Sequence, residues 1–341
     1  MLNSQRIFVD AVRTYCARRG IIADIRSQGW MIVMQRGAKR HFAFGYDVGL
    51  NSAIAHRIAN DKSATAEVLD MSGVPCVPHT LFLNPQLNEY IAATGSWEAM
   101  LALLRQNPQG IVVKPNEGTS GRSVFLVAAK PALELAVHKI FSSGLSIAIS
   151  PYLVVDDEVR VVLIDDAPAV VYSKNRPAVV GDGKHSFLEL ALAALPADRR
   201  STVLPGMLAE LDKAALDAIV PAGQRRVLNW RHNLETGARP IVLEQGKEDS
   251  PTRDACVLLA ARAAKAIGIR FASVDLVSVE GQWKVLEINS GVMMESLSKL
   301  HPELVYAAYH AALDKVFETD ADRPGACRDP WQKEDCSDSG R

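Results

Sequence analysis

Two apolar segments near the carboxyl end of the chain constrain its fold more than any other part of the sequence. Residues 273–277 and 283–289 are rich in β-branched side chains, and the short stretch Glu280-Gly281-Gln282 lies between them. Two such segments around a glycine-containing turn are typical of a β-hairpin, because glycine tolerates the backbone conformation that a tight turn requires. The sequence therefore predicts an antiparallel hairpin here.

The second arm of this hairpin carries oxygen-bearing side chains at alternate positions. Successive side chains of a strand point to opposite faces, so Glu287 and Asn289 should share one face. Leu286 and Ile288 should then be buried on the other face. Asp275 lies on the first arm, where antiparallel pairing can bring it near the other two ligands. Three oxygen ligands on a rigid hairpin suit Mg²⁺, and an ordinary hairpin with solvated acids is the alternative.

Length and composition indicate a globular protein of more than one packed unit. The 341 residues are too many for one core, and 48% of them are hydrophobic and 23% charged. A net charge of -1 gives no electrostatic reason to bind nucleic acid or an anionic membrane. The N-terminus lacks the apolar core of a signal peptide, and no apolar run is long enough to cross a bilayer. We therefore expect a soluble, cytoplasmic protein.

The cysteines argue against a disulfide framework and against a zinc site. They are odd in number and contain no C-x-x-C motif, whereas such domains carry closely spaced, usually paired cysteines. The five are scattered along the chain, at Cys16, Cys76, Cys256, Cys327 and Cys336.

Hydrophobic periodicity predicts helices and strands in mixed order. The expected helices cover 5–19, 51–71, 97–106, 132–142, 187–195, 252–267 and 304–317, with a helical insertion over 196–222. The expected strands are a hairpin within 21–46, strands at 111–115, 146–150, 156–164 and 169–174, and a strand and turn at 227–237. The polar stretch 319–341 is predicted to be a disordered tail.

Lys62 stands where its charge is unfavourable unless an anion is bound. The residues after Asp61 predict a helix start there, which places Lys62 in the first turn. The helix dipole disfavours a cation at this end. An anionic partner would explain the lysine, and a solvated surface lysine is the alternative.

A glycine-containing loop follows the short apolar strand that carries Lys114. The loop, residues 116–124, holds Gly118 and Gly121 together with two hydroxyl side chains, one of them Ser120. Such a loop can present backbone N–H groups to phosphate oxygens. It is not a P-loop, because G-x-x-x-x-G-K-[ST] is absent and the lysine precedes the loop. An ordinary glycine- and serine-rich turn is the alternative.

Residues 151–155 are apolar and run into a strand that begins with acidic side chains. That order suits a nucleotide, because adenine takes apolar walls and main-chain hydrogen bonds while a carboxylate takes the ribose hydroxyls. Alternation places Glu158 and Arg160 on one face of the strand. A surface ion pair, which contributes little in solvent, is the alternative.

Taken together in chain order, these stretches resemble the ATP-grasp superfamily. The resemblance is closest to the ATP-grasp domains of cyanophycin synthetase and the bifunctional glutathione synthetase, and more distant to D-alanine–D-alanine ligase. It covers residues from about 51 to 300, and G-D-G-K and P-A-G-Q are its most specific pieces. The matching stretches are Asn60 to Thr65, Val112 to Pro115 with Gly118 and Gly121, Asp157 to Arg160, Val180 to Lys184, Val220 to Gln224, Asn233 to Gly237, and Asp275 with Glu287 to Asn289.

The resemblance implies an α+β ATP-grasp fold, in which two α+β lobes sandwich ATP, with a small N-terminal α/β unit. The expected division is 1–60 for that unit, 61–150 for the first lobe, 151–318 for the second lobe, and 319–341 for the tail.

The resemblance also implies ATP and Mg²⁺ as cofactors and assigns roles to matching positions. By this resemblance, Lys62 and Lys114 would hold the ATP phosphates, and Gly118, Ser120 and Gly121 would form a lid over them. Pro151, Tyr152, Leu153 and Val154 would form the adenine hinge, with Glu158 on the ribose. Asp275, Glu287 and Asn289 would bind one or two Mg²⁺ ions. Arg160 would steady the reacting carboxylate, with Lys174 and Arg231 as further catalytic cations.

Two departures from the family pattern fall where the acceptor substrate would bind. Asn229 and Arg231 stand with their residue types exchanged relative to the family. After Asn289 the usual Pro-Gly is missing, and Met293 and Met294 follow instead. Both methionines are expected to be core or pocket wall. The departures therefore bear on the identity of the substrate more than on the reaction.

The implied activity is ATP-dependent ligation of a carboxylate to an amine through an acyl phosphate, with release of ADP and phosphate. The expected substrates are small molecules, an amino acid or a short peptide, and a homodimer is possible. The alternatives are an ATP-grasp phosphotransferase acting on a hydroxyl and a nucleotide-binding module without catalysis.

Overall fold

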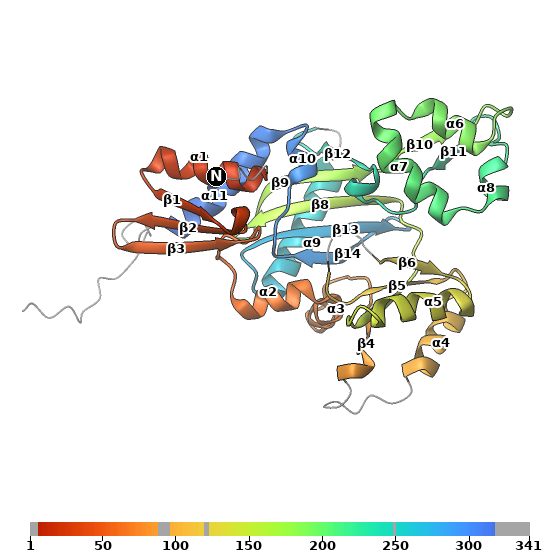
Figure 1. Cartoon of the computed structure of the whole chain (residues 1–341), viewed down its shortest axis with the longest axis horizontal. Helices are drawn as coiled ribbons and strands as arrows, with labels where there is room; N and C mark the ends of the chain where they lie inside the picture. Colours follow the sequence, from red (N-terminus) through yellow and green to blue (C-terminus); the bar gives the residue numbers. More distant parts are fainter. Residues whose placement is uncertain (1–5, 88–95, 119–122, 248–249, 318–341) are drawn as a thin grey trace, which may run out of the picture.

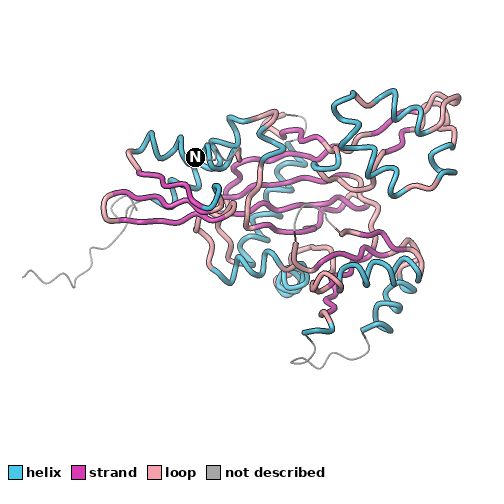
Figure 2. Tube along the Cα trace, in the orientation of Figure 1, coloured by secondary structure: helices cyan, strands magenta, loops and turns pink. Residues whose placement is uncertain are grey.

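The structure of the chain is a computed structural model that describes residues 6–87, 96–118, 123–247 and 250–317. Ser120 and Gly121 of the predicted lid, and the predicted tail, lie outside the described residues. Within these ranges, four antiparallel sheets and the helices around them give the α+β fold that the sequence predicted (Figure 1; Figure 2). None of the described helices is long and apolar enough to span a bilayer.

The chain begins with a helix and a three-stranded sheet. Helix α1 (Ile7–Arg19) ends at Gly20, whose φ of 64° allows its N–H to reach back to the Cys16 carbonyl. The sheet contains β1 (Ile22–Arg26), β2 (Met31–Arg36) and β3 (Lys39–Phe44), with the short helix η1 (Ser27–Gly29) after β1. The predicted hairpin is confirmed as β2 and β3, and β1 adds a strand to it.

The largest sheet has the strand order β12-β9-β8-β13-β14, and every pair in it is antiparallel. Its strands are β8 (Asp157–Ile164), β9 (Ala167–Asn175), β12 (Arg239–Val242), β13 (Phe271–Val279) and β14 (Gln282–Asn289). One face packs on α2 (Ala53–Asn60), α3 (Lys62–Met71) and α9 (Ser250–Ile267) through a continuous apolar core.

The other face of this sheet changes character along the strands. At one end it presents Val162, Val170 and Phe271, which are buried in a second apolar core. At the other end the same alternation presents Glu158, Arg160 and Asp275, because these positions are separated from the apolar ones by even numbers of residues. The apolar end is therefore built to be covered, and the polar end is left for a site.

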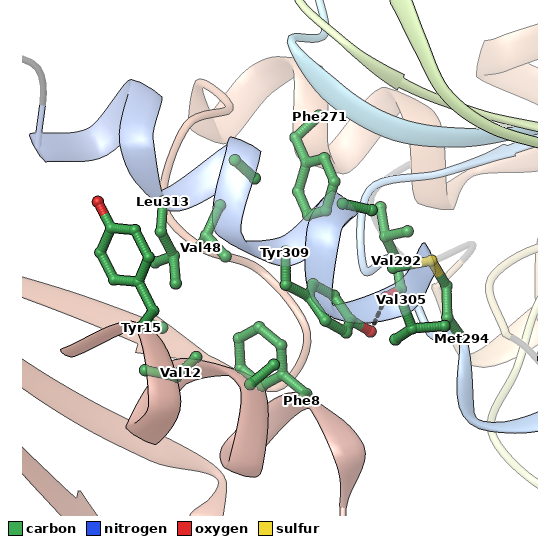
Figure 3. Packing of buried hydrophobic residues seen from close by; sticks show 14 of the residues in the cluster. Phe8, Val12, Tyr15, Val48, Phe271, Val292, Met294, Val305, Tyr309 and Leu313 are labelled. Atoms are coloured by element: carbon green, nitrogen blue, oxygen red, sulfur yellow. Dashed lines mark hydrogen bonds between the residues drawn. The ribbon is translucent and has the colours of Figure 1, made fainter. Parts of the chain in front are cut away.

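Helix α1 and the last described helix, α11 (Pro302–Phe317), cover the apolar end together with the short α10 (Glu295–Ser298). Figure 3 shows Phe8 against Tyr309, with ring centroids 5.0 Å apart and nearly perpendicular planes. The Tyr309 hydroxyl donates to the Val292 carbonyl at 2.7 Å. The two ends of the described chain therefore share one core with the central sheet.

A second lobe carries the sheet β4-β7-β5-β6 and its own apolar core. Its strands are β4 (Thr80–Phe82), β5 (Ile111–Pro115), β6 (Phe125–Val127) and β7 (Ile147–Pro151), and its helices are η2 (Pro85–Leu87), α4 (Ser96–Gln106) and α5 (Lys130–Phe141). Strand β7 leads directly into residues 152–156 and then into β8 of the central sheet.

An insertion between β9 and β12 forms a small helical cap with a fourth core. It contains β10 (Ala178–Val180), α6 (Phe187–Ala194), α7 (Ala197–Glu210), α8 (Lys213–Asp217), β11 (Arg225–Val227) and η3 (Leu234–Thr236). Gly181 packs directly on the P-A-G-Q stretch, since a Cβ there would lie 2.1 Å from the Pro221 carbonyl oxygen. The strand and turn predicted over 227–237 are confirmed only in part, because the turn is present at η3 and Gly237 but the strand ends at Val227, the last residue of β11.

The predicted hairpin at the carboxyl end is confirmed as β13 and β14. Glu280 and Gly281 both have positive φ, 52° and 73°, as a two-residue hairpin turn requires. The prediction for Leu286 is wrong. The pairing shifts by one residue after Asp275, so this bulge turns Leu286 into a cleft while Val285 and Ile288 are buried.

Candidate functional site

A cleft of about 1150 Å³ runs along the polar end of the central sheet. Its floor comes from β8, β9, β13 and β14, and its roof comes from β5 and the loop that follows it. One end is lined by residues 150–155, and the other reaches the N-terminal unit and residues 291–297. The cleft therefore touches every lobe of the described chain.

The floor of the cleft is a compact network of two acids and two bases. The Arg160 guanidinium donates to both oxygens of Asp275, at 2.6 and 2.5 Å, and Lys174 Nζ lies 2.9 Å from one of them. Lys174 also donates to Glu158 at 2.5 Å. Strand pairing explains the cluster, because Asp275 lies opposite Arg160 and the three strands present these side chains on one face.

Burial and charge pull against each other in this network. Burial alone would raise the pKa of Asp275, but Arg160 and Lys174 outweigh it and hold that pKa well below its usual range. Burial raises the pKa of Glu158 in spite of the Lys174 ammonium. Burial and Arg160 would lower the pKa of Lys174, yet the two carboxylates beside it raise that pKa. Asp275 is therefore an anion whose charge is already neutralised by protein cations.

Glu287 and Asn289 lie beside this network on β14, and both line the cleft. Glu287 pairs with Asp275 across the hairpin, and the Asn289 amide donates to Glu287 at 3.3 Å. A carboxylate and an amide oxygen, half-buried at the edge of a polar cleft, fit the donor set that Mg²⁺ prefers. Asp275 fits less directly, because cations occupy both of its oxygens. Within the part of the chain that the structure describes, no three His, Cys, Asp or Glu side chains lie together in a way that could hold a metal ion.

The two predicted phosphate-binding lysines lie on the roof. Asp61 caps α3 by accepting from the Ala64 N–H at 2.8 Å, which confirms the predicted helix start and puts Lys62 in its first turn. Lys62 Nζ donates to the Gly118 carbonyl at 2.9 Å. Asn116 ties this turn to the loop, since its amide donates to Asp61 at 2.7 Å and accepts from Ser63.

Lys114 is buried on β5 and lines the same cleft. Burial lowers the pKa of its ammonium to about 8, while Glu287 opposes that shift and Lys62 adds to it. The two lysines and Glu287 are therefore close enough to interact electrostatically, although they come from three separate elements.

The predicted hinge residues Pro151, Tyr152, Leu153 and Val154 all line one end of the cleft. The Tyr152 N–H donates to the Gly110 carbonyl at 3.0 Å, and its ring lies 5.7 Å from the Trp230 ring at an angle of 81°. Arg176 holds the two segments together by donating to the carbonyls of Val155 and Trp230. The four predicted hinge residues and the Trp230 ring thus line the cleft together, where the sequence predicted an adenine site.

Arg231 also lines the cleft, next to Trp230. Its N–H donates to the Asn229 side chain at 2.9 Å, and its guanidinium carbon lies 5.5 Å from the Trp230 ring. The structure brings the described members of the predicted site to a single cleft, with Gly118 at its rim.

Several cleft residues carry no sequence signal that would have identified them. The Tyr172 hydroxyl and His232 Nε2 are buried without a hydrogen-bond partner among the described residues, and both side chains line the cleft. His232 Nδ1 faces the Lys174 carbonyl at 2.8 Å, and burial, with Arg176 nearby, lowers the pKa of the ring to about 4. A buried polar group without a partner costs free energy, and a bound ligand or an ordered water can supply the missing bond.

The chain resembles known proteins in structure and not in sequence. No model of a protein family matches the chain, and no curated protein matches its sequence. A D-alanine–D-alanine ligase from Bacillus anthracis matches the structure with a TM-score of 0.50 and 17% identity, over 79% of this chain and 69% of that chain. The same ligase complexed with ATP matches with a TM-score of 0.48 and 17% identity, over 79% of this chain and 68% of that one.

A bifunctional glutathione synthetase from Pasteurella multocida matches with a TM-score of 0.48 and 19% identity, over 89% of this chain. The match covers 45% of that protein, so the chain spans less than half of its length. At these identities the similarity extends to the arrangement of helices and strands and no further. By that arrangement, the chain has the ATP-grasp fold.

Proposed function

We propose that the protein is an ATP-dependent carboxylate–amine ligase that forms an amide or peptide bond through an acyl phosphate. One observation carries the proposal: Lys62 and Lys114 on the roof face a floor of paired acids and bases, beside Glu287 and Asn289. Phosphoryl transfer depends mainly on positioning and on neutralising charge, and this cleft supplies cations and oxygen ligands for both. A ligase of the same fold has been solved with ATP, which supports a nucleotide here.

In this proposal the nucleotide lies along the cleft from the hinge to the lysines. The hinge residues 151–154 supply the apolar wall and main-chain groups for adenine, and Glu158 accepts from the ribose hydroxyls. Lys62 and Lys114 donate to the phosphate oxygens. Both ammonium groups come from elements joined by Asn116, so their spacing is fixed before the nucleotide arrives.

Glu287 and Asn289 would hold Mg²⁺, which when bound neutralises part of the triphosphate charge. Asp275 becomes available as a further ligand only when Arg160 or Lys174 turns to another anion. A substrate carboxylate is such an anion, and Arg160 is suited to it because a guanidinium binds carboxylates through two parallel bonds. We therefore assign Arg160 to the reacting carboxylate.

The chemistry then needs two displacements. A carboxylate oxygen attacks the γ-phosphorus, the bond from that phosphorus to the bridging oxygen of ADP breaks, and an acyl phosphate forms. The amine nitrogen attacks the acyl carbon, the carbon–oxygen bond to phosphate breaks, and the amine proton passes to solvent. Lys174 and Arg231 stabilise the oxyanion of the tetrahedral intermediate that forms when the amine adds to the acyl carbon, where one lost donor typically costs ~3 kcal/mol in activation free energy.

The size of the cleft supports a reaction with more than one ligand. Small-molecule sites usually measure about 300–1,000 Å³. The cleft, at about 1150 Å³, lies above that range, and its N-terminal end extends beyond Glu287 and Asn289. The predicted cytoplasmic location and homodimer remain predictions from the sequence.

The experiment that tests the proposal is a panel of amino acids and dipeptides, scored by free phosphate and by the mass of the product. A ligase releases ADP and phosphate together only when an acid and an amine are both present. ADP formed with a single alcohol, and without free phosphate, would identify a phosphotransferase instead. ATP binding without turnover across the panel would identify a nucleotide-binding module.

A further inference from the structure

The end of the cleft farthest from the hinge is lined by the N-terminal unit. Trp30, Phe44 and Tyr46 line it, and we call these three side chains the aromatic wall. Met293, Met294 and Leu297 line the cleft in the same region, after β14. None of the three aromatic residues belongs to the stretches that resemble known ATP-grasp proteins, so no established role covers them.

Two rings of the aromatic wall, Trp30 and Tyr46, are held in place by Arg6. Its guanidinium carbon lies 4.1 Å from the Tyr46 ring and 4.6 Å from the Trp30 ring. It donates to the carbonyls of Gly29, at 2.9 Å, and Gly45. Gly45 has a φ of 63°, and a Cβ there would come within 3.3 Å of the Trp30 ring. The Trp30 and Tyr46 rings are therefore fixed before any ligand binds, which lowers the entropy cost of binding.

Polar groups around the aromatic wall are already engaged with one another. The Tyr46 hydroxyl donates to Glu295 at 2.9 Å, and the other oxygen of that carboxylate accepts from the Ile7 N–H at 3.2 Å. Asp47 accepts from the Gly49 N–H at 2.7 Å and lies 3.2 Å from His56. What this end of the cleft offers a ligand is therefore mainly ring surface.

Two of the rings leave much of that surface exposed. Trp30 is 51% exposed and Phe44 is 67% exposed, with their centroids 6.4 Å apart. Exposed apolar surface inside a cleft is unfavourable in water and becomes favourable when a ligand covers it. Aromatic rings add preferred stacked and edge-to-face contacts with other rings.

We propose that the substrate bound at this end is an amino acid or short peptide with an aromatic or large aliphatic side chain, which packs on Trp30 and Phe44. This inference rests on the proposed ligase, because it places a substrate beside Glu287 and Asn289. It names the class of that substrate. Small, acidic and basic side chains would leave the two rings exposed and gain nothing from the aromatic wall.

The test compares three alanine variants of the full-length chain. Trp30→Ala and Phe44→Ala remove the proposed contacts. Phe42→Ala is the matched control. Phe42 lies two residues before Phe44 on β3, shares its strand face and is 54% exposed. Among the described residues, Phe42 is not one of those that line the cleft. We use phenylalanine, tryptophan, leucine, alanine, aspartate and lysine, free and as dipeptides, with ATP.

The expected result has two parts. The wild type uses the aromatic or leucine-containing members with a KM at least tenfold below that of their alanine counterparts. Trp30→Ala and Phe44→Ala each raise that KM by roughly tenfold and leave the KM for ATP unchanged, while Phe42→Ala changes neither. A preference for small or charged substrates, or equal effects of Phe44→Ala and Phe42→Ala, would overturn the inference.

Calorimetric titration of the same compounds separates this inference from the proposed activity. Binding of the aromatic members, weakened by Trp30→Ala, without any bond formation would contradict the ligase and support the binding site. Bond formation only with the alanine or aspartate compounds, and not with the aromatic or leucine compounds, would support the ligase and contradict the proposed contact with the aromatic wall.

Discussion

Asp275 shows why single residues of this cleft differ in what their substitution can reveal. It is 1% exposed, and it balances Arg160 and Lys174. Removing one partner of such a buried network leaves an uncompensated charge, which typically destabilises a protein by about 3–5 kcal/mol. A variant of Asp275 or Arg160 would therefore confound loss of function with loss of fold. Residues at the edge of the network give cleaner answers.

Glu287 is such a residue, because it lines the cleft and is not part of the buried ion pairs. Glu287→Gln keeps the size of the side chain and removes the negative charge that would hold Mg²⁺. We expect turnover to fall by at least a hundredfold while the urea midpoint stays within the error of the wild type. Full activity that still requires Mg²⁺ would remove Glu287 from the metal site.

Lys114 gives a prediction about protons. Its pKa of about 8 means that at pH 8.5 most of the buried ammonium has lost its proton. Bound phosphate favours the charged form and raises that pKa, so ATP binding should take up protons, and affinity should fall as pH rises above 8. Calorimetry at pH 8.5, in two buffers of different ionisation enthalpy, measures the uptake.

The matched variant for this measurement is Lys114→Arg, whose guanidinium stays charged throughout the range. We expect the proton uptake to disappear and the affinity to become flat between pH 7.5 and 9. Equal uptake in the wild type and in Lys114→Arg would assign the proton to another group.

Tyr172 should separate stability from function. Its hydroxyl is fully buried and without a hydrogen-bond partner among the described residues. Tyr172→Phe removes a polar group that gains nothing in the free protein, so the free energy of unfolding should stay constant or rise by up to about 1 kcal/mol. If a substrate supplies the missing bond, the same change should lower kcat/KM about tenfold. Destabilisation by more than 1 kcal/mol would show that the hydroxyl has a structural partner.

At the scale of elements, the hairpin of β13 and β14 sets the geometry of the site. Its register puts Asp275 opposite Glu287 and Ser273 opposite Asn289, so a slip of the pairing by one residue would turn Glu287 and Asn289 to the opposite face of the sheet. The tight turn at Glu280 and Gly281 helps to fix that register.

Two substitutions in this turn should change stability in opposite directions. Asparagine tolerates positive φ better than glutamate, so Glu280→Asn should stabilise the protein by up to about 1 kcal/mol. Gly281→Val should destabilise it by more than 1 kcal/mol, because a β-branched residue is strained at a φ of 73°. Urea denaturation measures both. Stabilisation by valine would contradict the assigned turn.

The features that the sequence predicted well are those encoded within one segment. The alternation and the central glycine predict the hairpin, and the residues around Asp61 predict the start of α3. Leu286 was mispredicted because the bulge depends on how two strands pair, which strict alternation cannot express. The length of β11 was overestimated because residues after it contact β9 and the hinge from a loop: His232 meets the Lys174 carbonyl, and Trp230 packs on Tyr152.

Neither the electrostatic network nor the aromatic wall could be predicted from local sequence patterns, and the physical reason is the same for both. Arg160 and Asp275 are 115 residues apart, and Tyr46 and Glu295 are 249 apart. Such pairs form only when strands and lobes assemble. A sequence shows which residues are able to pair, and the fold decides which of them meet.

At the scale of the whole molecule, one core joins the N-terminal unit, the central sheet and α11. Phe8 is fully buried in that core and contacts Tyr46 and Tyr309 at centroid distances of 5.7 and 5.0 Å. Because these rings belong to both ends of the described chain, the aromatic wall and the central sheet should be mechanically coupled.

Phe8→Ala tests this coupling. We expect a loss of about 3–5 kcal/mol in the free energy of unfolding, and a single transition that is the same by tryptophan fluorescence and by circular dichroism. Phe42→Ala, on the exposed face of the three-stranded sheet β1-β2-β3, should change the midpoint of unfolding very little. Two separate transitions, the earlier one confined to the N-terminal unit, would show that this unit folds independently.

The shared core of α1 and α11 also dictates the order of events during synthesis. The ribosome synthesises α1 about 300 residues before it reaches α11, the helix that covers the apolar face of α1. At roughly 5–20 residues per second, that interval is on the order of 15–60 s. During this time the apolar face of α1, including Phe8, is exposed to solvent on the nascent chain. We therefore expect chaperones to bind α1 before the cleft has formed.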